Sequence, residues 1–185
     1  VKCNSLNEEK EDFMVGVKGY AKRRNRALRY LMEEGFNETT PTRLGRDLVI
    51  TSINREEVYD SLRWCRQNNV FPLFRPLMPI GAARNLKDWM LGKEEIKEMY
   101  EKAREIDRKE FGIDYNLTLP YMGGVWCRQL HYAIYVNILG EAYPCTGSKR
   151  LLGNFKTQSL REIWNSEEAR RIRIRPYDSC PLRES

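Results

Sequence analysis

The chain has 185 residues, of which 41% are hydrophobic and 31% charged. This composition is typical of a folded protein and excludes an intrinsically disordered one. No stretch approaches the roughly 18 consecutive apolar residues of a membrane-spanning helix, so we expect no membrane association. The formal net charge of +6 allows an anionic partner, but many soluble enzymes share this balance, and on charge alone we do not expect nucleic acid.

The cysteines and the first residues indicate a reducing compartment. Five cysteines are an odd number, and a chain of this length needs no disulfides to be stable. The first twelve residues, VKCNSLNEEKED, lack the apolar core of a signal peptide. We therefore expect a cytoplasmic protein, in which clustered cysteines are more often metal ligands than disulfides. Cys3, in a strand pattern, and Cys65, on the apolar stripe of a helix, are predicted to be packing residues.

The chain begins with an extended segment followed by a helix. Residues 1–5 (VKCNS) are predicted to form a short strand, and residues 19–34 a helix. Ala27, Leu28 and Leu31 lie on one stripe of that helix, so we expect all three to face the core.

A second strand and helix come next. Residues 47–52 (DLVITS) form an apolar, β-branched run that is typical of a buried strand. Asn54 and Glu57 have the spacing of a capping box and predict the start of a helix. Residues 70–77 (VFPLFRPL) are again extended. The order strand, helix, strand, helix, strand predicts an α/β fold with a parallel sheet covered by helices.

A long charged helix separates this half from a region of different character. Residues 93–111 have an apolar helical stripe and end at Gly112, a typical C-terminal cap. Short strand patterns, glycines and aromatic residues follow it, and Ser159 and Glu162 then have the spacing of a capping box that starts a further helix. We therefore divide the chain into a first domain (1–92), a linking helix (93–115) and a second domain (116–185).

Three cysteines of the second domain form a spaced pattern. Twelve residues separate Cys127 from Gly140, four separate Gly140 from Cys145, and Cys180 comes late in the chain. The intervening HYAIYVNILGEAYPC is predicted to be a two-stranded ribbon that turns at the glycine. Such a ribbon returns its two cysteines to the same place, as a disulfide or a metal site would require. Thiolates are soft ligands that select zinc or iron–sulfur centres, and these alternatives stay open at this point.

This pattern, with GNF (153–155), SLREIW (159–164) and DSCP (178–181) after it, resembles the auxiliary-cluster domain of radical S-adenosylmethionine (radical SAM) enzymes. The domain is called SPASM or, in its shorter form, twitch. VKCNS, DLVITS and VFPLFRPL resemble the fourth to sixth strands of the partial barrel in that superfamily. The implied fold class is α/β: the second half of a partial (β/α) radical-SAM barrel, then a small α+β SPASM/twitch domain with a β-hairpin and a helix.

The resemblance implies that Cys127, Cys145 and Cys180 bind an auxiliary [4Fe–4S] cluster. The alternatives are a structural zinc site on the same cysteines and buried cysteines that bind nothing. The family usually continues Cys-x2-Cys, but Arg183 stands at the expected position. The fourth ligand therefore lies beyond the chain, comes from elsewhere, or is missing and leaves one iron open.

The resemblance also implies contacts with S-adenosylmethionine at the carboxyl ends of the strands, where ligands gather in α/β folds. Asn4, Ser5, Ser52 and Asn54 are the candidates. Asn4 and Ser5 have the alternative role of capping the next turn, and for Asn54 we favour the helix cap. Arg75 could bind a carboxylate, although an exposed arginine is the simpler reading.

The Cys-x3-Cys-x2-Cys loop that binds the catalytic cluster of the superfamily does not occur in this sequence. We therefore expect these residues to be the C-terminal part of a longer oxidoreductase that is inactive without its N-terminal half. The complete enzyme would bind S-adenosylmethionine and a second [4Fe–4S] cluster, receive electrons from an external donor and act on a small-molecule or peptide substrate. The alternative function is a basic, zinc-stabilised nucleic-acid-binding module.

Overall fold

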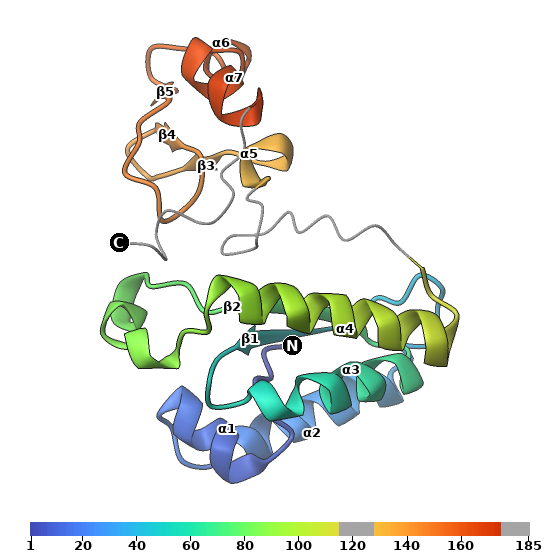
Figure 1. The fold of residues 1–185 in the computed structure, drawn as a ribbon. Coiled ribbons are helices and arrows are strands. Elements are labelled where there is room, and N and C mark those ends of the chain that lie inside the picture. Colours follow the sequence, from blue (N-terminus) through green and yellow to red (C-terminus); the bar gives the residue numbers. More distant parts are fainter. Residues whose placement is uncertain (115–127, 175–185) are drawn as a thin grey trace. The chain divides into compact units, whose positions relative to one another are not determined.

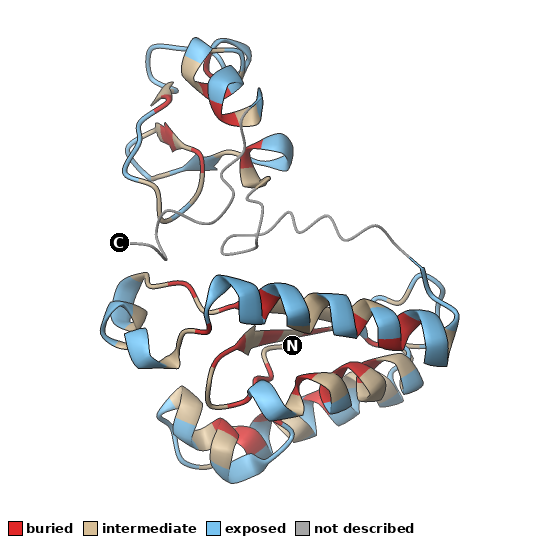
Figure 2. Ribbon diagram, viewed as in Figure 1, coloured by how far each residue is buried: buried red, intermediate tan, exposed pale blue. Residues whose placement is uncertain are grey.

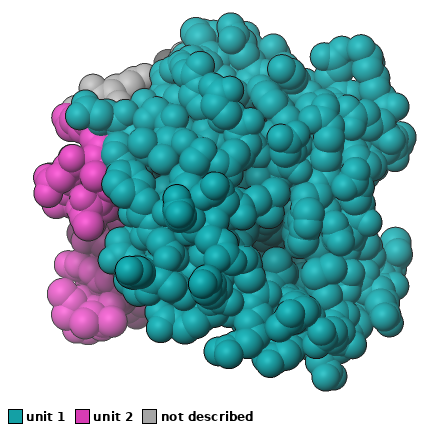
Figure 3. Space-filling model, turned by 90° about the horizontal axis from the view of Figure 1, so that it is seen from below, with its two compact units in different colours: residues 1–77, 88–116 teal, residues 78–87, 117–185 magenta. Residues whose placement is uncertain are grey.

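The computed structural model describes residues 1–114 and 128–174, as a mixed α/β fold with two small sheets (Figure 1). The chain divides into two compact units, which Figure 3 shows in separate colours. Unit 1 contains Val1–Leu77 and Asp88–Asn116, and unit 2 contains Met78–Lys87 and Leu117–Ser185. None of the described helices combines the length and the apolar character needed to cross a membrane.

Unit 1 is built on two parallel strands, β1 (Gly45–Ile50) and β2 (Phe71–Pro76), which pair along their whole length. Their pairing confirms the predicted parallel arrangement. Lys2 adds one parallel bridge to Asp47 of β1. The predicted strand over residues 1–5 is thus reduced to a bridge, because the next backbone N–H groups donate to the side chain of Glu11 and not to β1.

The described part of unit 1 has four α-helices: α1 (Glu8–Val15), which packs on α2 (Tyr20–Glu33), and α3 (Val58–Gln67) and α4 (Lys93–Phe111). Short 3-10 helices connect them: η1 (Arg55–Glu57), η2 (Gly81–Asn85, of unit 2) and η3 (Lys87–Trp89). Leu28 of α2 and Cys65 of α3 share one core cluster with Leu44 and Val70, which adjoin the strands. In Figure 2 the buried residues of α2 and α4 lie along one side of each helix. Unit 1 therefore has one layer of strands with helices packed on it.

The buried face of α2 differs from the predicted stripe by one position. Ala21, Arg24 and Leu28 are buried, whereas Ala27 is exposed. The helix turns an arginine inward because the Arg24 guanidinium donates to the carbonyl of Ser5 (3.1 Å).

The prediction of a capping box at Asn54 is wrong, although the helix predicted to follow it is present as α3. Asn54 makes no capping hydrogen bond, and the chain passes through η1 before α3 begins. The Asn54 side chain instead accepts from the backbone of Thr51 (2.8 Å) and donates to that of Val49 (2.9 Å). The Glu57 carboxylate reaches Ser5 and Lys10. The side chains of Asn54 and Glu57 thus bond elsewhere in the fold and do not cap the helix.

The charged helix over residues 93–111 is confirmed as α4. Gly112 follows it with φ 65°, and its N–H donates to the carbonyl of Asp107. Ala103 and Ile106 of α4 pack on Leu62 of α3. The helix that we expected to link two regions is thus packed within unit 1.

Unit 2 contains a three-stranded antiparallel sheet in the order β3–β4–β5: β3 (Tyr135–Val136), β4 (Glu141–Tyr143) and β5 (Gly153–Asn154). Its helices are α5 (Gln129–Tyr132), α6 (Leu160–Trp164) and α7 (Glu167–Ile174). The predicted ribbon is present but shorter, since its first two residues belong to α5. That helical turn carries Leu130 into the core and leaves His131 exposed.

The hairpin between β3 and β4 turns at Asn137–Glu141 as the glycine predicted. Gly140 has φ 82°, a left-handed conformation that side chains disfavour. The side-chain oxygen of Asn137 accepts from the N–H groups of Leu139 (2.9 Å) and Glu141 (3.0 Å). The turn is therefore held by its own side chain.

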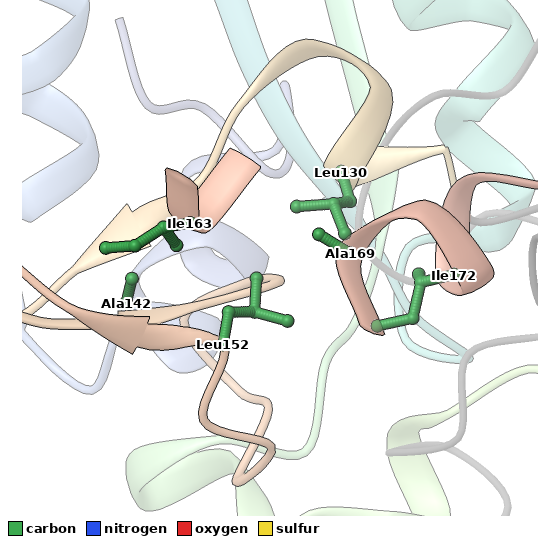
Figure 4. Close-up of a cluster of buried hydrophobic side chains, with 6 residues drawn as sticks. All are labelled: Leu130, Ala142, Leu152, Ile163, Ala169 and Ile172. Atoms are coloured by element: carbon green, nitrogen blue, oxygen red, sulfur yellow. The ribbon is translucent and has the colours of Figure 1, made fainter. Parts of the chain in front are cut away.

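Figure 4 shows the core of unit 2, in which every labelled side chain is apolar. Its members are Leu130, Ala142, Leu152, Ile163, Ala169 and Ile172. A Cβ added at Gly153 would come within 2.8 Å of the Ile163 side chain, so the glycine of GNF permits α6 to pack on β5. The predicted capping box of α6 is confirmed: Ser159 Oγ accepts from the N–H of Glu162 (3.3 Å).

Candidate functional site

Cys145 is the one predicted cluster ligand that lies within the described residues; Cys127 and Cys180 lie outside them. It follows β4 after a single residue, Pro144, and its thiol is free and half-buried. Within residues 1–114 and 128–174, no three His, Cys, Asp or Glu side chains are grouped as a metal site requires. The three-cysteine site therefore stays a prediction.

The strand that leads to Cys145 is fixed by a chain of side-chain hydrogen bonds. The Glu141 carboxylate accepts from Asn137 Nδ2 (2.7 Å) and from the Tyr143 hydroxyl (2.9 Å). These bonds lower the pKa of Glu141, and the bond to Glu141 raises the pKa of Tyr143. Tyr143 lies opposite Tyr135 in the hairpin, with ring centroids 6.3 Å apart. The hairpin thus presents Cys145 on an ordered strand.

The other cysteines of the described residues are unsuited to ligation. Cys3 and Cys65 are fully buried, which confirms that both are packing residues. Burial raises the pKa of the Cys65 thiol to about 11. Because a metal ligand is a thiolate, this thiol is a poor candidate.

Three of the four predicted cofactor contacts meet at the carboxyl ends of the first segment and β1. Asn54 Nδ2 donates to the carbonyl of Asn4 (2.8 Å), and Asn4 Oδ1 accepts from the N–H of Val49 (3.1 Å). The Ser5 hydroxyl donates to Glu57 Oε2 (2.5 Å). Asn4, Ser5 and Asn54 are all buried. Of these three side chains, Asn4 has a donor left for a ligand, since its Nδ2 makes no hydrogen bond within the described residues. The buried Arg46 Nη1 and Nη2 and Arg24 Nε also make none there.

Ser52, the fourth candidate, lies apart from these three. Its N–H donates to the carbonyl of Trp89 (2.9 Å), and its hydroxyl donates to that of Asp88 (3.0 Å). It ties the end of β1 to the segment that precedes α4 and remains half-exposed.

Glu11 is the central residue of this strand-end network, and no sequence pattern indicated it. Its Oε2 accepts from the N–H groups of Asn4 (2.8 Å) and Ser5 (2.7 Å). The residue is fully buried, and desolvation raises the pKa of its carboxyl against the effect of these two bonds. Glu11 therefore holds the Asn4–Ser5 backbone in a turn.

Two buried arginines complete the network, and sequence reasoning missed both because it treats arginine as a surface residue. Arg46 Nε donates to the carbonyl of Cys3 (3.1 Å), and Arg24 donates to the Cys3 thiol. Burial lowers the pKa of Arg24 to about 10. A usable signal exists for Arg46, since it alternates with the buried Leu48 and Ile50 of β1 and so shares their face.

A second ion network lies on the same strands. Asp47 Oδ2 accepts from Arg75 Nη2 (2.6 Å) and lies 3.7 Å from Lys2 Nζ. Burial lowers the pKa of Lys2, partly against the attraction of Asp47. Arg75 is thus paired within the protein, and all three side chains keep some exposure.

Comparison with protein families finds a match near the end of the chain. Residues 127–182 match the family model of SPASM, an iron-sulfur cluster-binding domain. The matched segment begins at Cys127 and includes Cys145 and Cys180. No curated protein matches the chain. The SPASM match implies that this part of the protein binds an iron–sulfur cluster.

Proposed function

We propose that this protein is part of a radical SAM enzyme whose SPASM domain holds an auxiliary [4Fe–4S] cluster on Cys127, Cys145 and Cys180. The observation that carries the proposal is the SPASM match, because it starts at the first of these cysteines and contains all three. SPASM domains are typical of radical SAM enzymes. Residues 1–92 would then be the second half of the partial barrel, and residues 93–115 the helix that links it to the cluster domain.

The chemistry of the donors fits an iron–sulfur cluster. Clusters are held by thiolates from separate segments of chain. Cys145 supplies a thiol that is neither in the core nor in a disulfide, at the end of an ordered hairpin. With a fourth protein ligand the cluster would transfer electrons; with these three thiolates alone it would bind substrate at the open iron.

The strand-end network of unit 1 offers a side-chain hydrogen-bond donor to a polar cofactor. Among the four predicted contact residues, Asn4 has a side-chain N–H group, Nδ2, that makes no hydrogen bond within the described residues, so Asn4 is the best candidate of the four to contact S-adenosylmethionine. Ser5 and Asn54 would act by holding Asn4 in place, since their side chains bond within the protein. When bound and reductively cleaved, S-adenosylmethionine supplies a 5′-deoxyadenosyl radical, which would abstract hydrogen from a small-molecule or peptide substrate.

Metal analysis of the chain purified without oxygen tests this function. We expect iron and sulfide in equal amounts and the brown colour of an iron–sulfur centre. Cys127→Ser, Cys145→Ser and Cys180→Ser should each lower the iron content. The matched control is Cys65→Ala, whose thiol is buried away from any ligand and which should keep its iron.

Colourless protein with tightly bound zinc would contradict the proposal and favour a structural zinc site. Equal iron loss in the Cys65→Ala variant would also contradict it, because the loss would then reflect folding and not ligation. An electron paramagnetic resonance spectrum that changes with added substrate would support the open-iron role.

A further inference from the structure

Helix α2 has an exposed face that is unusually basic. It consists of Lys22, Arg23, Arg26 and Arg29, with Lys18 just before the helix; we call these five residues the basic face of α2. All five are exposed. Within the described residues, Arg29 is the only one in an ion pair, a long one of 3.8 Å to Glu33.

Helix stability does not explain this arrangement. The positive end of the α2 dipole already has an anionic partner, because the Asp12 carboxylate accepts from the N–H groups of Gly19 and Ala21. Lys22, Arg26 and Arg29 follow one another at helical spacings of four and three, so their like charges repel. An anion bound from outside would offset this repulsion.

The size of the basic face limits what that anion can be. From Lys22 to Arg29 it extends about 10 Å along the helix axis. Exposed carboxylates border it: Glu33 and Glu34 at the end of α2, and Glu8 of α1, which accepts from Asn25 of α2 (3.0 Å). A nucleic-acid duplex carries a charge about every 1.7 Å and would continue past the face onto these carboxylates. A short acidic patch on a protein would not.

The residue types of the face also favour a protein over a nucleic acid. Ala27 and Tyr30 are its other exposed residues, so it has neither a large apolar centre nor several aromatic rings on which bases could stack. Charged surfaces without an apolar centre are typical of weak, transient protein encounters, in which electrostatic attraction raises the association rate.

We propose that the basic face of α2 is a docking surface for an acidic protein partner, which binds weakly and in a salt-dependent manner. This inference is independent of the iron–sulfur function, since it concerns unit 1 alone.

The test measures binding of the whole chain to a helical peptide with glutamates spaced to face Lys22, Arg26 and Arg29. We expect binding at low salt that weakens as salt is added. Lys22→Glu combined with Arg26→Glu should weaken it about tenfold or more. The matched control is Lys97→Glu combined with Arg108→Glu, which makes the same charge change at exposed positions of α4 and should bind like the wild type.

Three outcomes would overturn the proposal: no binding at low salt, equal weakening in both double variants, or tighter binding of a DNA duplex than of the peptide. The second would show that only net charge matters, and the third that nucleic acid is the ligand. Misfolding is checked by thermal unfolding. The α2 variant should unfold at close to the wild-type temperature, because both substitutions are at exposed positions.

Discussion

Unit 1 and unit 2 have cores of opposite character. All the buried polar or charged residues in the described part of the chain belong to unit 1: Asn4, Ser5, Glu11, Arg24, Arg46, Thr51, Asn54, Ser61 and Asp107. The core cluster of unit 2 is entirely apolar. Polar groups are costly to bury unless they are hydrogen-bonded. In unit 1 this cost is offset by the hydrogen bonds that hold its strand ends, whereas the hydrogen bonds that hold the hairpin of unit 2 lie outside its apolar core.

The largest expected effect comes from leaving a buried charge of unit 1 unpaired. Arg66 bonds Asp107 through both oxygens (2.7 and 2.6 Å), and Asp107 is fully buried. Arg66→Met should lower the free energy of unfolding by about 3–5 kcal/mol in a urea titration. Arg63, which makes the same two-pronged contact with the exposed Glu110, is the control: Arg63→Met should cost at most about 1 kcal/mol. Equal losses would show that burial is not what distinguishes the pairs.

In unit 2 the corresponding weak point is a cavity. Ile163 is fully buried between the sheet and the helices. Ile163→Ala should destabilise unit 2 by about 2–5 kcal/mol, because it removes packed atoms and leaves a void. Hydrogen exchange resolved along the chain should show faster exchange in β4 and α6, with unit 1 unaffected. Leu160→Ala, at an exposed position of α6, should stay within about 0.5 kcal/mol of the wild type.

The smallest effect is a pH dependence that belongs to unit 1. Burial raises the pKa of Glu11 above its ordinary value of 4.5, so the folded state retains a proton that the unfolded state has released. The stability from this proton is complete below pH 4.5 and is lost as the pH rises through the raised pKa.

Glu11→Gln keeps an oxygen for the N–H groups of Asn4 and Ser5 but cannot ionise. Urea unfolding between about pH 4 and pH 8 should therefore show a weaker decline with pH in this variant than in the wild type. Glu9→Gln, at an exposed position of α1, should retain the wild-type slope. If Glu11→Gln also retained it, the Glu11 carboxyl would not be the source.

Predictions that depended on neighbours in the sequence were correct. The helix α4 begins and ends at the predicted residues because its apolar stripe and its stop at Gly112 are local. The capping box of α6 is likewise made by residues three positions apart. The parallel pairing of β1 and β2 followed from their alternation with helices.

Predictions failed where a distant residue offered a better partner. Asn54 has the sequence context of a helix cap, yet its amide bonds Asn4, 50 positions away. The ribbon before β3 is shortened because Leu130 turns into the core of unit 2. Ala27 is exposed, and not part of the buried stripe of α2, because Arg24 is buried instead and donates hydrogen bonds to Cys3 and Ser5.

The sequence by itself determined the helices α2, α3 and α4, the parallel strands β1 and β2, and the cysteine pattern that the SPASM match shares, because helix periods and ligand spacings act over short stretches of chain. Only the tertiary structure decided that Glu11, Arg24 and Arg46 are core residues that hold a strand end. The physical reason is that a charged group is buried only where remote parts of the chain bring hydrogen-bonding partners to it. The local sequence does not reveal these tertiary contacts.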